Sequence, residues 1–395
     1  MASMVYKRTV PRRGAVGPRG FRAPTNGVAN GDFNQFLMPV PPVRTLYDLT
    51  LDKRETKNKT DAIFEKEIID RAANLTPSLE LRNRISEYAK KVIVALEKEK
   101  SEKTLNDIAI ATIVHVGSSV TDTTTHSSDK SDVVVQLSTL PSYETVAELG
   151  RKVVENMKSA DPKETGEPLQ MEYGCLISSH NCQVRILITI MPEDSTKLEP
   201  LLHLDSKQMM INFFSIRHVN WYLRMSKSSP AELVQEWQAL VRVLKDTRSR
   251  FKSFEPLSIW TIQYLAFYCL SNGPNRQKIN LGTAFRRFFE TIASGLFLPK
   301  SPCLVDPVSP NYRIGFDLTL QQMDVVCTGA QTLLRIFATG NDGYRAILGT
   351  HGTAADLTQT ASTWNGIEIR PAPSVYVEGC MDRFPAKEGN PAVQG

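Results

Sequence analysis

The chain has 395 residues, of which 41% are hydrophobic and 23% are charged. These proportions exclude a wholly disordered protein, and the length predicts two domains or one large bilobal unit. The net charge of +5 arises from 47 basic and 42 acidic side chains, so the chain as a whole is not strongly basic.

Membrane and disulfide-stabilised classes are also disfavoured. The longest apolar stretch, residues 257–270, contains polar residues and is shorter than the ~20 residues that a transmembrane helix needs. No apolar signal-peptide core precedes Phe33. Six cysteines without a C-x-x-C spacing argue against a disulfide scaffold and a zinc ribbon. We therefore expect reduced thiols and a reducing compartment, the cytosol or the nucleus.

The excess positive charge lies in residues 1–31. This segment contains six of the 47 basic residues and no acidic residue, which leaves 41 basic and 42 acidic side chains elsewhere. Its Arg, Gly and Pro content cannot bury enough apolar surface to offset the entropy of ordering. We expect a disordered basic arm that contacts nucleic-acid phosphates or a carrier protein, with the candidate nucleic-acid contacts Arg12, Arg13, Arg19 and Arg22. A purely solubilising tail is the alternative.

The first half of the folded body, residues 32–202, mixes helical and strand patterns. Apolar residues at three- and four-residue intervals predict helices over 61–74 and 77–101, the second with Thr76 as N-cap and Pro77 in its first turn. Runs rich in β-branched residues predict strands near 106–116, 132–137, 171–177 and 183–191, and a helix is expected near 143–157. This half therefore indicates a small mixed sheet with helices packed on it.

From residue 203 onward the pattern is almost purely helical. The expected helices, separated by Pro and Gly, cover about 205–224, 230–249, 256–271, 280–296 and 319–339. We predict a helical C-terminal lobe over 203–370, and a disordered tail over 371–395. A cleft between the two lobes is the natural place for a ligand.

One motif carries chemistry. Gly117-Ser118 follows a predicted strand, and Asp132 opens the next one. A Gly-Ser turn can offer backbone N–H groups and a hydroxyl to phosphate oxygens, and neighbouring carboxylates can hold Mg²⁺ against a triphosphate. Taken alone, the motif is weak, because Gly-Ser is a common dipeptide and acids often mark strand starts.

The order of these segments supports the interpretation of the motif as a phosphate-binding site. A strand, Gly-Ser, a carboxylate-led strand and then a helical lobe resembles the template-free nucleotidyltransferases. The blocks that narrow the resemblance to the DZF-domain proteins include THSSDKSDVVVQLSTLPSYETVAELGRKVVENM, HLDSKQMMINFFSIRHVNWY, LVRVLKDTRSRFKSFEPLSIW and VCTGAQTLLRIFATG. The resemblance covers residues 35–370 and implies an α+β, bilobal nucleotidyltransferase-like fold, with a mixed β-sheet N-terminal lobe and an all-helical C-terminal lobe.

The family is thought to have lost catalysis, and the carboxylates of this chain can be examined for that separately. Asp129 and Asp132 are three positions apart, whereas acids on one face of a strand are two apart, so the pair cannot hold one metal ion unless Asp129 lies on the preceding loop. The strand near 183–190 contains no carboxylate, and Glu193 and Asp194 come only after it. Two-metal phosphoryl transfer needs anionic ligands for both ions. We expect a pseudoenzyme without a metal site or catalytic residues; the alternative is an active nucleotidyltransferase acting on RNA.

A chain that has no catalytic activity could still bind a nucleotide. The resemblance places Lys245 near a triphosphate and Trp260 against a base, which together with Gly117, Ser118 and Asp132 forms the candidate vestigial site. Lys245 as a solvated helix residue and Trp260 as a core residue are the alternatives. No cofactor is required, and an ATP- or UTP-type nucleotide with Mg²⁺ is the ligand class to test.

A cationic and aromatic cluster lies further along the chain, at Arg217, His218 and Trp221. These side chains either line the cleft or pack between the lobes, and we favour packing. The histidines do not have metal-ligand spacing with a cysteine or another histidine.

The last helical segments suggest a protein interface. The run 323–337 is apolar on more than one face, so it should be buried in the core or against a partner. The candidate interface residues are Leu333, Phe337, Tyr344, Arg345 and Ile347. The resemblance implies a heterodimer with a larger DZF protein that carries double-stranded-RNA-binding domains. It further implies RNA contact mainly through that partner, a nuclear location with or without shuttling to the cytoplasm, and a role in RNA processing and transcriptional regulation.

Overall fold

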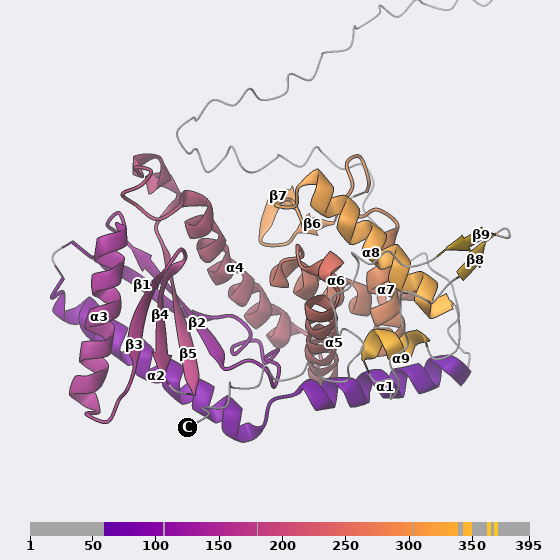
Figure 1. Ribbon diagram of the computed structural model, residues 1–395, viewed down its shortest axis with the longest axis horizontal. Coiled ribbons are helices and arrows are strands. Elements are labelled where there is room, and N and C mark those ends of the chain that lie inside the picture. Colours follow the sequence, from indigo (N-terminus) through magenta and orange to yellow (C-terminus); the bar gives the residue numbers. More distant parts are fainter. Residues whose placement is uncertain are drawn as a thin grey trace, which may run out of the picture. The chain divides into compact units, whose positions relative to one another are not determined.

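The computed structural model describes residues 59–105, 107–179, 181–302, 304–338, 343–349, 362–364 and 367–369 (Figure 1). The predicted basic arm with Arg12, Arg13, Arg19 and Arg22, and the predicted tail over 371–395, lie outside these residues. None of the described helices is both long enough and apolar enough to cross a membrane. Four cysteines are buried free thiols: Cys175, Cys182, Cys269 and Cys327.

A five-stranded mixed sheet forms the centre of the first half. Its strand order is β1 (Ile110–Val116), β2 (Lys130–Leu137), β5 (Cys182–Thr189), β4 (Gly174–Ser179) and β3 (Glu167–Met171). β2 and β5 pair in parallel, while the other neighbours are antiparallel. Seven of the eight residues of β2 are buried, as expected for a central strand covered on both faces.

Helices cover both faces of this sheet. α2 (Leu79–Glu102) and α3 (Tyr143–Ala160) pack on one face, where Val133, Ile186 and their neighbours form one apolar core. α4 (Ser206–Ser228) covers the other face, where Val134 and Val219 belong to a smaller cluster. Asn212 of α4 fixes this contact, because its side-chain amide donates to the carbonyl oxygen of Ile188 at 2.7 Å.

A second apolar core lies in the helical region. It is built by α5 (Ala231–Arg250), α6 (Ile259–Ser271), α7 (Leu281–Ala293), α8 (Leu320–Ala338), α9 (Gly343–Leu348) and α1 (Lys59–Leu75). Three 3₁₀ turns cover Pro192–Lys197, Lys252–Phe254 and Pro274–Arg276. A small ribbon of β6 (Val305–Asp306) and β7 (Ser309–Arg313) lies between α7 and α8 in the chain, and a second, of β8 (Ser362–Trp364) and β9 (Ile367–Ile369), follows α9.

The predicted α+β arrangement is confirmed, with three local corrections. α1 packs with α5, α7 and α9 rather than with the sheet, and α4 packs on the sheet although it follows residue 203 (Figure 1). The expected division at residue 203 therefore assigns both helices to the wrong region. The N-cap of α2 is Ser78, whose hydroxyl accepts from the N–H of Leu81 at 3.1 Å, and not Thr76.

A buried ionic cluster joins α1, α5 and α9. The carboxylate of Asp246 accepts from Arg71 Nη2 at 2.9 Å and from Arg250 Nε at 3.0 Å. Arg250 also donates to the carbonyl oxygen of Ile347 at 2.6 Å. All three charged side chains are almost fully buried. One carboxylate therefore bridges two guanidinium groups that have left water, and it fixes α1 against the helical region.

Replacing this carboxylate should be strongly destabilising. We predict that Asp246→Asn lowers the free energy of unfolding by about 3–5 kcal/mol, because two buried arginines lose their counter-charge. Urea denaturation of the full chain measures this. The control is Asp70→Asn, an exposed aspartate on α1, which should stay within about 0.5 kcal/mol of the parent chain. Equal stabilities of the two variants would show that the cluster contributes little.

Candidate functional site

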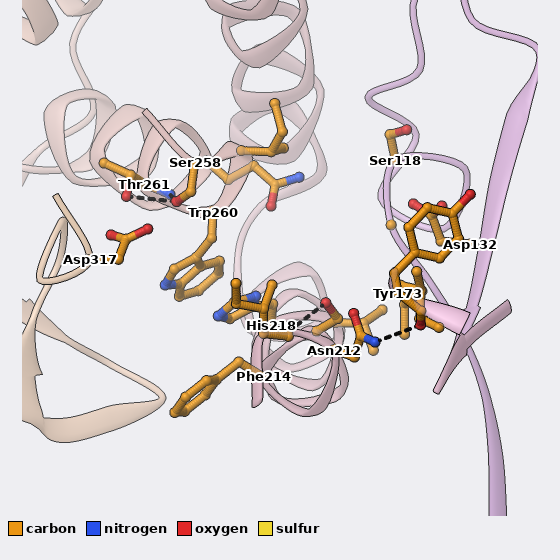
Figure 2. A pocket seen from close by; sticks show the side chains of 18 of the residues that line it. Ser118, Asp132, Tyr173, Asn212, Phe214, His218, Ser258, Trp260, Thr261 and Asp317 are labelled. Atoms are coloured by element: carbon orange, nitrogen blue, oxygen red, sulfur yellow. Dashed lines mark hydrogen bonds between the residues drawn. The ribbon is translucent and has the colours of Figure 1, made fainter. Parts of the chain in front are cut away.

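A cavity of about 700 Å³ lies between the sheet and the helical region. All five predicted nucleotide-binding residues line it: Gly117, Ser118, Asp132, Lys245 and Trp260. In Figure 2, Ser118 and Asp132 lie on one side of the cavity and Trp260 on the other, with His218 of α4 between them. The structure therefore brings together residues that are up to 143 positions apart in the sequence.

The turn after β1 requires glycine at its first position. Gly117 has a φ of +82°, which is a left-handed conformation that other residues rarely adopt. A side chain there would also collide with the carboxylate of Asp132. Asp132 lies opposite Val116, the last residue of β1. Turn and carboxylate are thus held side by side, as the sequence motif predicts.

The carboxylate of Asp132 is neutralised by an arginine. The parallel register places Arg185 of β5 directly beside Asp132 of β2. Nε of Arg185 donates to Oδ1 at 2.6 Å, and Nη2 donates to Oδ2 at 2.9 Å. This two-point pair occupies both carboxylate oxygens. β5, which contains no carboxylate, therefore places a cation directly beside Asp132.

The position two residues before Asp132 is also cationic. Lys130 lines the same cavity, because residues two apart in a strand share a face. Asp129 lies on the preceding loop and does not line the cavity, and Glu193 and Asp194 lie in the 3₁₀ turn Pro192–Lys197.

Mg²⁺ therefore does not fit the Asp132 end of this cavity, and the other carboxylates that line it, Asp306 and Asp317, lie on the Trp260 side. One carboxylate, already paired, stands beside two cations, whereas Mg²⁺ needs oxygen ligands and is repelled by like charge. Within the described part of the chain, we also find no cluster of three or more His, Cys, Asp or Glu residues that could hold a metal ion.

Lys245 is not a solvated helix residue. Its Nζ donates to the carbonyl oxygen of Thr123 at 2.8 Å, in the loop after the Gly117 turn. Burial lowers its pKa to about 8, and the nearby Asp132 carboxylate partly opposes that effect. Arg242, one turn earlier on α5, donates to the carbonyl oxygens of Asp122 and Thr124. α5 thus holds the 121–124 loop at the edge of the cavity.

Trp260 is part of an aromatic stack. Its ring lies parallel to the imidazole of His218, with 4.1 Å between centroids and 9° between planes. Tyr264 stacks at 5.8 Å and 15°, and the indole N–H donates to Asp306 at 3.0 Å. A ring of the protein already occupies the near face of Trp260, so the expectation that this face receives a base is not met in this conformation.

The cationic and aromatic residues predicted beside the site, Arg217, His218 and Trp221, do not all lie in the same environment. His218 lines the cavity, whereas Trp221 packs edge-on against Trp260 at 5.2 Å and does not line it. Arg217 lies over Phe213 and donates to the carbonyl oxygen of Val308 at 3.4 Å. Packing between elements, the interpretation favoured from the sequence, describes Trp221 and also His218, which stacks on Trp260 of α6 while it lines the cavity, whereas Arg217 is exposed.

The candidate interface residues are mostly internal. Leu333 and Ile347 have no exposed surface, so their prediction as contact residues is wrong. Phe337 and Tyr344 pack edge-on against Phe64 of α1. Arg345 forms a 2.7 Å ion pair with Glu67 of the same helix. The apolar faces of this segment are therefore covered largely by the chain itself, since α1 folds back onto them.

Several cavity residues were missed by the sequence reasoning. They are Lys130, Tyr173, Arg185, Lys207, Asn212 and Asp306. The two-residue spacing of Lys130 and Asp132 could have revealed Lys130. Arg185 could be placed beside Asp132 only once the parallel pairing of their strands was known.

Comparison with known proteins now gives the family. A model of the DZF N-terminal domain matches residues 20–227, and a model of the DZF C-terminal domain matches residues 236–370. The chain belongs to the DZF family. The predicted family resemblance is thereby confirmed.

Two solved structures of Cid1 show the fold. Cid1 in complex with the UTP analogue UMPNPP is 12% identical, with a TM-score of 0.51 over 74% of this chain and 99% of the other. Another structure of the Cid1 poly(U) polymerase gives 12% identity and a TM-score of 0.50 over the same shares of each chain. CdnC of E. coli MS115-1 with ATP is 16% identical, with a TM-score of 0.48 over 72% of this chain and 95% of the other. The DZF protein thus has a nucleotidyltransferase-like fold.

The His218 ring should make the DZF protein sensitive to acid. Burial, together with the charge of Arg217, lowers the pKa of His218 to about 3, whereas the unfolded chain has a value near 6.5. Below pH 6.5 the unfolded state binds a proton that the folded state does not, so stability falls as pH falls toward 3. The slope approaches about 1.4 kcal/mol per pH unit. We predict a flatter stability profile between pH 6.5 and 4 for His218→Phe, measured by urea denaturation.

A matched control separates titration from packing. Phe214→Leu removes a ring of the same stack but no titratable group, so its profile should keep the slope of the parent chain. An unchanged slope in His218→Phe would contradict the pKa assignment.

Proposed function

We propose that this DZF protein is a non-catalytic scaffold subunit. In this proposal it pairs through its DZF domain with a larger DZF protein that carries double-stranded-RNA-binding domains, and it is a counterpart of the small subunit of the interleukin enhancer-binding factor heterodimer. The complex acts in the nucleus, in RNA processing and in transcriptional and post-transcriptional regulation.

The proposal that the protein is not a catalyst rests on one observation, the position of Arg185 beside Asp132. Phosphoryl transfer by this fold class depends on carboxylates that hold metal ions between the attacking and leaving oxygens. Here a guanidinium group stands 2.6 Å from the one carboxylate at that position, and Lys130 adds a second positive charge. A site with this charge pattern supports ligand binding and not metal-assisted chemistry.

Family membership carries the pairing part, because DZF domains mediate heterodimerisation in DZF proteins. In our proposal RNA is contacted mainly by the partner, and the basic arm with Arg12, Arg13, Arg19 and Arg22 assists through phosphate contacts. An active nucleotidyltransferase acting on RNA is the second candidate, favoured by the fold alone.

The contact surface needs side chains that the chain itself leaves exposed. On α8, the exposed large apolar side chains are Leu320 (64%) and Val325 (38%). They replace the buried Leu333 and Ile347 as the residues to test. Apolar side chains at the centre of an interface lose most when they are replaced by a charge.

Partner capture tests the proposal. The tagged full chain, isolated in high salt with nuclease, should retain a DZF protein with double-stranded-RNA-binding domains in equal amount. Val325→Asp should reduce that recovery by about tenfold or more, which corresponds to the ~1.4 kcal/mol that one well-packed interface residue contributes. The control Leu201→Asp changes a residue that is 97% exposed in the sheet region and should pair normally. Absence of a DZF partner would contradict the scaffold proposal.

A further inference from the structure

α4 exposes basic side chains on the face that does not cover the sheet. The helix contains Lys207, Arg217, Arg224 and Lys227 and no acidic residue. Because side chains three and four positions apart share one face of a helix, Arg217, Asn220, Arg224 and Lys227 form a single row, which we call the α4 row. All four side chains are exposed, and none of them lines the cavity.

The positive charge of the α4 row is not balanced by the protein. Within the described part of the chain, its three cations form no ion pair with a carboxylate, and Arg224 and Lys227 donate no side-chain hydrogen bond. Arg217 is held more firmly, since it donates to the carbonyl oxygen of Val308. Its charge also opposes the rise in the pKa of Asp306 that burial causes. Residues outside the basic arm number 41 basic and 42 acidic, so a row of one sign is a local surplus.

We propose that the α4 row is a binding site for the sugar–phosphate backbone of double-stranded RNA. Arginine and lysine side chains contact phosphate oxygens without reading the base sequence. With a rise of about 1.5 Å per residue, the row from Arg217 to Lys227 is about 15 Å long, so it can meet more than one phosphate of a duplex. The inference rests on the proposed function, to which it adds a direct RNA contact on the folded body.

The surroundings of the row favour a duplex over other anionic partners. Sequence-tolerant binding of single strands uses aromatic rings on which bases stack, but the guanidinium group of Arg217 lies over the neighbouring ring of Phe213, at 5.0 Å. The apolar face of α4 is buried against the sheet at Val219, so the helix has no apolar face to insert into a membrane. Leu223, which is 41% exposed, gives the row one apolar neighbour on α4, whereas a protein interface needs a cluster of apolar anchors.

Fluorescence anisotropy of labelled duplex RNA, titrated with the full chain at several salt concentrations, tests this. The variant Arg224→Gln, Lys227→Gln removes two exposed, unpaired charges, so its fold should be unchanged. We expect its affinity to fall about tenfold, and the slope of log affinity against log salt concentration to become less steep by about 2. The loss should be the same for duplexes of unrelated sequence. The basic arm is intact in every variant, so any difference comes from the α4 row.

A matched pair of charges on another helix is the control. The variant Arg151→Gln, Lys158→Gln on α3 also removes one exposed arginine and one exposed lysine that are unpaired among the described residues, and it should bind like the parent chain. Arg224→Lys, Lys227→Arg keeps both charges of the row and should bind like the parent as well. Equal affinities of the α4 glutamine variant and the α3 control would overturn the inference. A large loss in the charge-keeping variant would overturn it too, because charge would then not be what the RNA contacts.

The same variants test the other anionic partners. Single-stranded RNA, polyglutamate and vesicles that contain phosphatidylserine are titrated separately. A loss confined to one of these ligands, or no duplex binding by the parent chain at low salt, would overturn the assignment to double-stranded RNA.

Partner capture separates this inference from the proposed function. The α4 glutamine variant should retain the DZF partner as the parent chain does. Normal pairing with unchanged RNA affinity refutes the inference alone, and pairing lost only in this variant refutes it as well, because the row would then contact protein. Absence of a DZF partner from parent and variant alike refutes the proposed function.

Discussion

The parallel pairing of β2 and β5 is the constraint on which the site depends. Val133 and Val135 of β2 and Ile186 and Ile188 of β5 have no exposed surface and lie in the core beneath α2 and α3. A shift of the pairing by one residue would turn these side chains to the wrong face of the sheet, so the register is fixed by burial. Arg185 must then lie beside Asp132. The pairing of Asp132 with Arg185 is therefore set by the register of the two central strands.

The helical side of the cavity is held just as firmly. Lys245 and Arg242 tie α5 to the loop that follows the Gly117 turn, and Trp260 is enclosed by His218 and Tyr264. Such contacts position side chains without help from a ligand. The DZF protein thus has a nucleotidyltransferase-like fold with a cavity between the sheet and the helical region, in which Lys130 and Arg185 lie beside Asp132.

The sequence predicted the elements better than their packing. Helices and strands follow from apolar periodicity, which is a local property, and so does the turn at Gly117. The placement of α1 and α4 depends on which distant surface covers an amphipathic face, and periodicity does not contain that information. Leu333 shows the same limit: an apolar helix face can be covered by a partner or by another part of the chain, and here the chain covers it.

In the candidate site, some residues could be predicted from residue type and local spacing alone, and others could not. Gly117 and Asp132 were predicted because a turn and a carboxylate have a meaning at short range. The role of Arg185 arises only from its neighbour across the sheet, 53 positions away in the sequence. Trp260 was assigned to a base, but His218 occupies its face. Contacts between distant segments therefore decided both the missed residue and the changed role.

The most direct test of the central claim is a nucleotide-incorporation assay on the full chain. Labelled ATP or UTP is supplied with single-stranded RNA and with Mg²⁺ or Mn²⁺, and Asp132→Asn serves as the matched reference. Our account predicts that the parent chain extends RNA no more than this variant does, because the paired carboxylate holds no metal ion. Extension by the parent chain that Asp132→Asn abolishes would contradict it and establish an active nucleotidyltransferase.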